Sequence, residues 1–88
     1  MSTATDALRS ILATMAESLV DDPGAVRLEI TETPENTVFE IHVPAAEMGK
    51  LVGKQGRNIQ AIRTLMSAMG AKHERKVQIE IVEPDVEE

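Results

Sequence analysis

The stretch "VGKQGRNIQAIR", residues 52–63, holds two glycines, Gly53 and Gly56, on either side of Lys54 and Gln55. An amphipathic pattern begins directly behind the second glycine. Glycines let a chain turn tightly, and they let another backbone approach without Cβ atoms in the way. The stretch therefore predicts a tight, basic turn at the start of a helix, and the other elements are predicted on either side of it.

The residues behind the turn predict a helix, because Ile59, Ile62, Met66 and Met69 recur at helical spacing and Gly70 is placed to close it. Backbone N–H groups at a helix N-terminus lack partners within the helix, and the helix dipole favours anions there. The turn is thus a candidate site for an anion such as a sugar-phosphate backbone.

The charge distribution supports an anion site. The chain has a net charge of −6, yet seven of its nine Lys and Arg residues lie between Lys50 and Lys76, where Glu74 is the only acid. A local basic surface attracts anions even when the whole chain is acidic. The basic residues nearest the glycines are Lys50, Lys54, Arg57 and Arg63.

A first amphipathic helix is predicted before "DDPG", residues 21–24, which ends it. Thr3 or Thr5 can cap its N-terminus. Its face can be entirely core, or it can be partly a dimer surface, and the sequence leaves both open. The apolar positions of this helix are Leu8, Ile11, Leu12, Met15 and Leu19.

Three segments alternate between apolar and polar residues and predict strands: residues 26–31, 39–43 and 77–81. The turn "TPEN" makes a hairpin of the first two. Pro44 suits the start of a short helix over residues 45–52. The predicted order is therefore α-β-β-α-α-β.

This order predicts an α+β fold, a two-layer sandwich of a three-stranded sheet and three helices. We expect the helices to cover the face with Leu28, Ile41 and Ile79, and we expect Phe39 to lie in the core. The chain is expected to form one domain over residues 1–83, with an acidic tail over 84–88. The opposite face should meet water or a partner; it carries Arg27, Glu29, Glu40, His42, Gln78 and Glu80.

With the order α-β-β-α-α-β, the segment "GKLVGKQGRNIQAIRTL", residues 49–65, resembles the core of a type II KH domain, in which a GXXG loop clamps about four nucleotides of single strand. Length and layout resemble the bacterial KhpA family essentially end to end. The resemblance implies binding of single-stranded RNA, and a role as an RNA chaperone or post-transcriptional regulator.

The resemblance also implies which residues bind. Gly53 and Gly56 match the glycines of the loop, and Lys54 and Gln55 match its variable middle. Val52 and Ile59 match aliphatic positions that floor the nucleotide groove. Arg57 and Arg63 match basic positions of the following helix, and Lys50 can reinforce them. Glu47 stands where the family has an acid before "GK".

Other site chemistries find little support. A nucleotide-binding P-loop needs four residues between its glycines, followed by Lys and Ser or Thr. Here three residues separate Gly49 from Gly53, and Gln55 stands where the hydroxyl residue should be. The chain has no cysteine, and its two histidines, His42 and His73, lie in separate elements. We therefore expect no metal site, no cofactor and no enzymatic activity.

The N-terminus has no basic start and no continuous apolar run, so we expect neither a signal peptide nor a membrane span, and a cytoplasmic location. The resemblance implies a homodimer, or a heterodimer with a larger RNA-binding protein of the Jag (KhpB) type. The alternative function is a protein-interaction adaptor that keeps the KH fold and holds a partner on a helix or sheet face.

Overall fold

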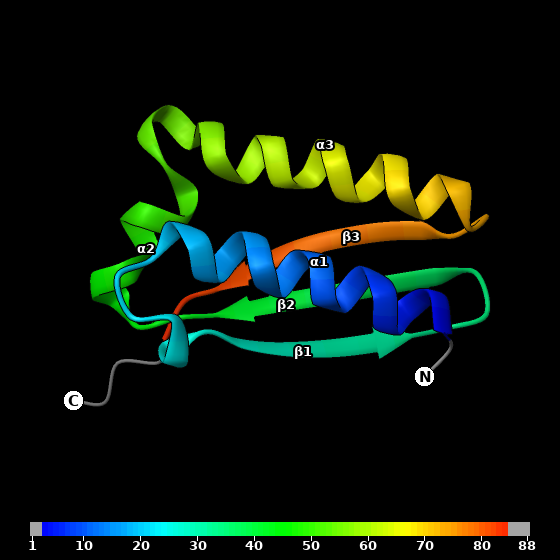
Figure 1. The fold of residues 1–88 in the computed structure, drawn as a ribbon, viewed down its shortest axis with the longest axis horizontal. Helices are drawn as coiled ribbons and strands as arrows, with labels where there is room; N and C mark the ends of the chain where they lie inside the picture. The colour runs from blue at the N-terminus through cyan, green and yellow to red at the C-terminus, as the bar shows by residue number, and fades with distance from the viewer. Residues whose placement is uncertain (1–2, 85–88) are drawn as a thin grey trace.

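The computed structural model describes residues 3–84, and it confirms the predicted order of helices and strands (Figure 1). Two short 3-10 turns, Pro23–Ala25 and Lys54–Gly56, join the longer elements. These are α1 Thr3–Leu19, β1 Arg27–Glu32, β2 Asn36–His42, α2 Ala45–Val52, α3 Arg57–Lys72 and β3 Lys76–Val82.

The sheet has the strand order β1-β2-β3. β1 and β2 are antiparallel, with Leu28 opposite Ile41, which confirms the predicted hairpin. β2 and β3 are parallel, with Phe39 opposite Ile79. A parallel pair needs a long crossover between its strands. Here α2 and α3 form that crossover, so the glycine turn lies in the middle of it.

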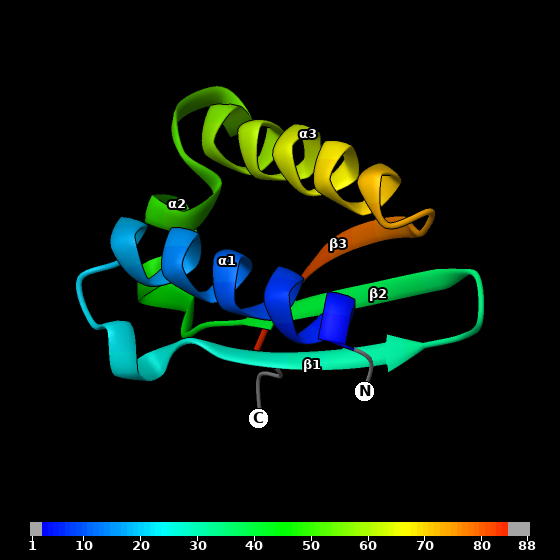
Figure 2. The ribbon, with the colours of Figure 1, turned by 45° about the vertical axis from the view of Figure 1, so that its right-hand side comes forward.

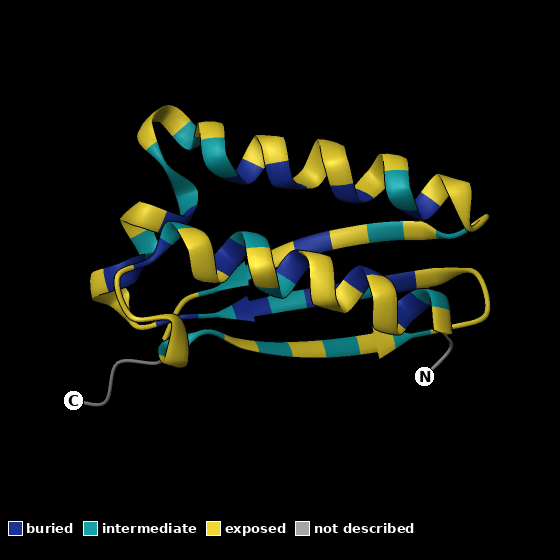
Figure 3. Cartoon of the chain, viewed as in Figure 1, coloured by how far each residue is buried: buried dark blue, intermediate teal, exposed yellow. Residues whose placement is uncertain are grey.

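α1 and α3 lie side by side over one face of the sheet, and Figure 2 shows the two layers from a second direction. The core lies between these layers, and its centre is formed by Phe39, Ile41, Leu12 and Met66, each with no exposed surface. In Figure 3 the buried segments of both helices face the sheet. The predicted two-layer sandwich is confirmed.

The other face of the sheet carries the polar residues of the alternating pattern, as expected. Arg27, Glu29 and Glu80 are exposed, and Glu40 and His42 are half-buried. No helix within residues 3–84 combines the length and the apolar content that crossing a bilayer requires.

One expectation for α1 was wrong, and one open alternative is narrowed. Thr5 does not cap the helix; it lies within it, fully buried, and its hydroxyl donates a hydrogen bond to Glu32. Ile11 is 40% exposed, so the apolar face of α1 is not entirely core. Ala16 is buried instead, because the face that meets the sheet is centred on Leu8, Leu12 and Ala16.

Gly70 does not close α3. The helix continues to Lys72, and the chain reverses at Glu74, whose φ is +58°. Gly70 is buried where the helix meets β3, and a Cβ there would collide with the Val77 side chain and lie 3.0 Å from the Arg75 carbonyl oxygen. Close packing therefore explains this glycine better than helix termination.

The predicted division into a domain over residues 1–83 and an acidic tail over 84–88 stays a prediction. Residues 1–2 and all of the tail beyond Pro84 lie outside the described residues.

Candidate nucleic-acid interface

The turn between α2 and α3 has the left-handed backbone that its glycines suggest. The φ angles of Gly53, Gln55 and Gly56 are +81°, +59° and +74°. Residues other than glycine adopt this backbone region only at a cost in free energy. Three such residues among four reverse the chain sharply, and the turn lies at the upper left of Figure 1, between α2 and the start of α3.

Asn58, which the sequence did not single out, holds the two sides of this turn together. Its side-chain amide donates a hydrogen bond of 3.0 Å to the carbonyl oxygen of Lys50, in the last turn of α2. The same side chain occupies the space beside Gly53, where an added Cβ would lie 2.5 Å from the Asn58 Cγ. Gly53 is thus required by its backbone angles and by its neighbour.

The backbone amides at the start of α3 are less open to a ligand than expected. The N–H of Gly56 donates to the carbonyl of Gly53, and the N–H of Arg57 donates to that of Lys54. The N–H of Gly53 is likewise bonded, to Gly49. An anion at this turn would therefore depend strongly on side chains.

Three exposed side chains surround the turn: Lys54, Gln55 and Arg57. Arg57 donates a hydrogen bond of 3.1 Å from Nη2 to the Gln55 side-chain oxygen, which holds the guanidinium over the turn. An ammonium and a guanidinium on the same turn suit phosphate oxygens, and the guanidinium can donate two parallel hydrogen bonds.

Lys50 lies close to the turn but already has acidic partners. Its Nζ is 2.8 Å from Oδ2 of Asp21 and 3.9 Å from Oε1 of Glu47. The hydrogen bond to Asp21 and the charge of that carboxylate raise the pKa of Lys50, so its amine stays charged at neutral pH. An exposed ion pair of this kind is weak, so a phosphate could compete with Asp21 for Lys50.

Glu47 has a structural role. It is buried, and its two carboxylate oxygens accept hydrogen bonds from the backbone N–H groups of Asp21, at 3.1 Å, and Asp22, at 2.7 Å. A carboxylate that satisfies two backbone donors fixes α2 against the segment that follows α1. The sequence marked this residue as a family position without indicating this role.

The two aliphatic positions flank the turn within the core. Ile59 is 5% exposed and belongs to the core cluster, and Val52 is half-buried against that cluster. Their remaining exposed surface is small, so an aliphatic groove floor would be narrow.

Arg63 lies away from the turn, about 10 Å further along α3 at 1.5 Å per residue. Its Nε donates a hydrogen bond of 3.2 Å to the carbonyl oxygen of Ile79, in β3. It borders a cleft of about 470 Å³ between α3 and this edge strand. The cleft is lined by Arg63, Ser67, Val77, Gln78, Ile79 and Glu80.

The basic segment of the sequence is therefore not one surface. Lys54 and Arg57 lie at the first turn of α3, whereas Lys72 lies in its last turn, about 20 Å away. The Arg75 side chain is held within the fold. It donates a hydrogen bond of 3.0 Å to the Thr37 hydroxyl and forms an ion pair of 2.9 Å with Glu32.

The α-β-β-α-α-β sandwich with a Gly-x-x-Gly turn in its parallel crossover is a KH domain of the type II arrangement. The model of the KhpA/KhpB KH domain matches residues 9–81. The chain belongs to this family.

Relatives support the assignment over most of the chain. The RNA-binding protein KhpA of Aquifex aeolicus is 42% identical over 77 residues, which are 88% of this chain and 98% of that protein. The RNA-binding protein KhpA of Listeria monocytogenes is 36% identical over 76 residues, which are 86% of this chain and all of that protein.

Two solved structures share the fold. Era of Aquifex aeolicus, bound to GDP and an aluminium fluoride, superimposes with a TM-score of 0.60 at 20% identity, over 88% of this chain and 30% of that one. Era in complex with a nucleotide and part of 16S ribosomal RNA gives a TM-score of 0.59 at 20% identity, over 86% of this chain and 29% of that one. At this identity the likeness concerns the fold alone.

Proposed function

We propose that this protein binds single-stranded RNA at the turn between α2 and α3, as a binding module rather than an enzyme. The observation that carries the proposal is the exposed pair Lys54 and Arg57 on a turn fixed by Gly53, Gly56 and Asn58. The KhpA relatives, which are named as RNA-binding proteins, support the same ligand.

In this proposal the turn clamps the sugar-phosphate backbone and Arg63 guides the strand along α3. Gln55 adds amide contacts, and Lys50 exchanges Asp21 for a phosphate. Val52 and Ile59 form the narrow apolar floor of the groove.

Phe39, the only aromatic residue, is fully buried, so bases cannot stack on it. Affinity should therefore be modest and the sequence preference broad.

The proposal extends to a cytoplasmic role as an RNA chaperone or post-transcriptional regulator, with no cofactor. Such a role needs RNA to be bound through its backbone and released readily, and a small phosphate clamp without stacking residues suits that need.

The test is a fluorescence anisotropy titration of a labelled random single-stranded RNA pool, repeated at several salt concentrations. If three or four phosphates are engaged, the logarithm of the binding constant should fall with the logarithm of salt with a slope of roughly −2 to −3. A matched DNA pool measures the contribution of the 2′-OH. Absence of binding at high micromolar protein would contradict the proposal and favour the adaptor.

We further propose that the chain pairs with a second KH protein through the outer surface of α1 and α3. Among the described residues, the exposed large hydrophobic side chains are Ile11, 40% exposed, and Leu65, 52% exposed. Leu65 borders an apolar cleft of about 330 Å³ between the two helices, which Met15 and Leu19 also line. A second copy of this chain is the simplest occupant, and a KhpB-type protein is the other.

Leu65→Glu should disrupt this association, because it places a charge in the proposed interface at a position that is already exposed in the monomer. Size-exclusion chromatography with light scattering should give twice 9.6 kDa for the parent and 9.6 kDa for the variant. Gln60→Glu, an exposed position on α3 with the same change in charge, is the control. A parent that stays monomeric would leave the KhpB-type partner to be tested by co-elution.

A further inference from the structure

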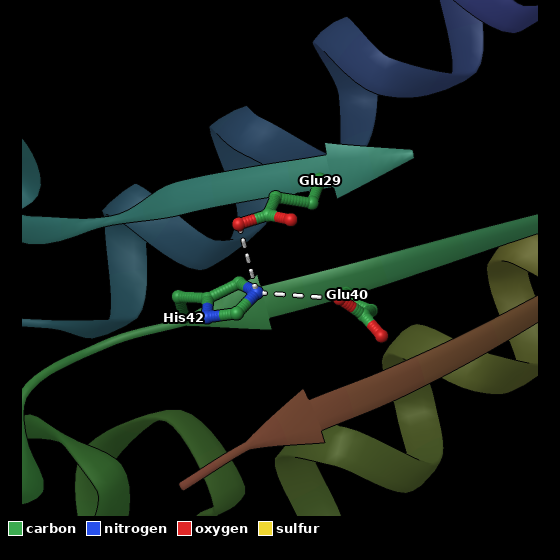
Figure 4. Close-up of side chains that lie close together, drawn as sticks. All are labelled: Glu29, Glu40 and His42. Carbon is green, nitrogen blue, oxygen red and sulfur yellow. Dashed lines mark hydrogen bonds and ion pairs between the residues drawn. The ribbon is translucent and has the colours of Figure 1, made fainter. Parts of the chain in front are cut away.

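The open face of the sheet, opposite the helices, gathers three metal-binding groups: Glu29 from β1, and Glu40 and His42 from β2 (Figure 4). The strand register explains the cluster. Glu29 and Glu40 are direct partners in the antiparallel pair. His42 lies two residues beyond Glu40 on the same face, because side chains alternate along a strand.

The two separations between His42 and the carboxylates are those found between neighbouring ligands of a zinc ion. Nε2 of His42 is 3.4 Å from Oε1 of Glu40 and 3.6 Å from Oε2 of Glu29. The candidate donor atoms of all three residues lie within 4.8 Å of one another. Zinc bonds of about 2.0–2.2 Å in tetrahedral geometry separate neighbouring donors by about 3.3–3.6 Å. The imidazole nitrogen thus lies at this separation from both carboxylates, on a side of the sheet where water can be the fourth ligand.

The charges across the sheet favour a cation at this place. Glu40 is the direct partner of Glu29 on one side and of Glu80 on the other, so three carboxylates form one row. Like charges directly opposite in neighbouring strands destabilise a sheet. Arg27 forms an ion pair with Glu29 at one end of this row.

We propose that Glu29, Glu40 and His42 form a Zn²⁺ site that links β1 to β2. An imidazole together with carboxylates suits zinc, whereas magnesium and calcium prefer oxygen ligands alone. Binding releases any proton on Nε2 and neutralises the two carboxylates of the site. The site lies on the opposite layer from the α2–α3 turn, and it does not depend on the proposed function.

The site is tested by calorimetric titration of the full chain with ZnCl₂, in a buffer that does not chelate zinc. We expect one saturable equivalent and a higher melting temperature with zinc than without it. His42→Ala should weaken binding about tenfold or more. His73→Ala removes the other histidine, in the turn after α3, and should bind zinc as the parent does. ¹⁵N shifts of the two imidazoles should show zinc at His42 and not at His73.

Two further variants protect the test against misfolding and against zinc bound elsewhere. Glu40→Gln keeps the shape of the side chain and should also weaken binding. Arg27→Ala removes the cation that competes for Glu29 and should tighten binding a few-fold. Binding that is equal in His42→Ala and the parent, or no saturable binding at millimolar zinc, would overturn the site. RNA binding by His42→Ala should be unchanged, so this result is separate from the proposed function.

Discussion

Reversing the charges of Lys54 and Arg57 together, with Lys54→Asp and Arg57→Asp, is expected to weaken binding of single-stranded RNA by about tenfold to a hundredfold at moderate salt. Both side chains are exposed beside the turn, so the change replaces phosphate attraction with repulsion. The dependence of binding on salt should become shallower, because fewer counterions are released. Anisotropy titrations of parent and variant at several salt concentrations measure both effects.

The fold should tolerate this variant. Neither residue belongs to the core, and acidic side chains at a helix N-terminus interact favourably with the helix dipole. The matched control is Arg9→Asp with Lys76→Asp, which changes net charge equally at exposed positions away from the turn. If both double variants lose affinity to the same extent, overall charge explains binding and the turn is not the site.

Gly53→Ala should destabilise the protein much more than Gly56→Ala, although the two glycines are equivalent in the sequence motif. Gly53 has φ +81° and ψ 170°, a region open to glycine almost alone, and an added Cβ would displace Asn58. Backbone strain and a lost hydrogen bond together should cost about 3 kcal/mol or more.

Gly56 has φ +74° and ψ 16°, an ordinary left-handed conformation, and nothing lies within 4 Å of an added Cβ. Alanine there should cost about 1–2 kcal/mol. Urea unfolding of both variants gives the comparison, and Asn58→Ala separates the lost hydrogen bond from the backbone strain. Equal losses in the two glycine variants would refute the assigned roles.

Local patterns were sufficient to predict the elements and the faces of the sheet. The alternation around Leu28, Ile41 and Ile79 identified the buried face, and the helical spacing of Ile59, Ile62 and Met66 identified the inner side of α3. The parallel pairing of β2 with β3 was not predicted, because periodicity says which residues share a face and not which strands are neighbours.

The errors occurred where a residue's role depends on a distant partner. Thr5 has a capping side chain, but Glu32 accepts its hydroxyl from 27 residues away. Glycine is typical of a helix end, but Gly70 is explained by the Val77 side chain of β3, which packs against it. Glu47 and Asn58 bind backbone groups of other segments, and no local pattern marks such contacts.

The candidate site could be predicted only in part, because some of its contacts are local in sequence and others join distant segments. The turn is local in sequence, so the place of its glycines and the exposure of Lys54 and Arg57 could be predicted from the motif, while their role in binding stays a prediction. Arg63 could be named but not placed, because the carbonyl of Ile79 that it contacts is 16 residues away.

The hydrogen bond from Asn58 to Lys50 fixes the two ends of the turn before any ligand arrives. Ordering a flexible residue costs about 1–2 kcal/mol in conformational entropy. The four residues from Gly53 to Gly56 lose this entropy when the protein folds, and burial of the hydrophobic core offsets the loss. They therefore have little entropy left to lose when a ligand binds. A ligand that makes few contacts could therefore still bind, because almost none of the free energy of those contacts would be needed to order the loop.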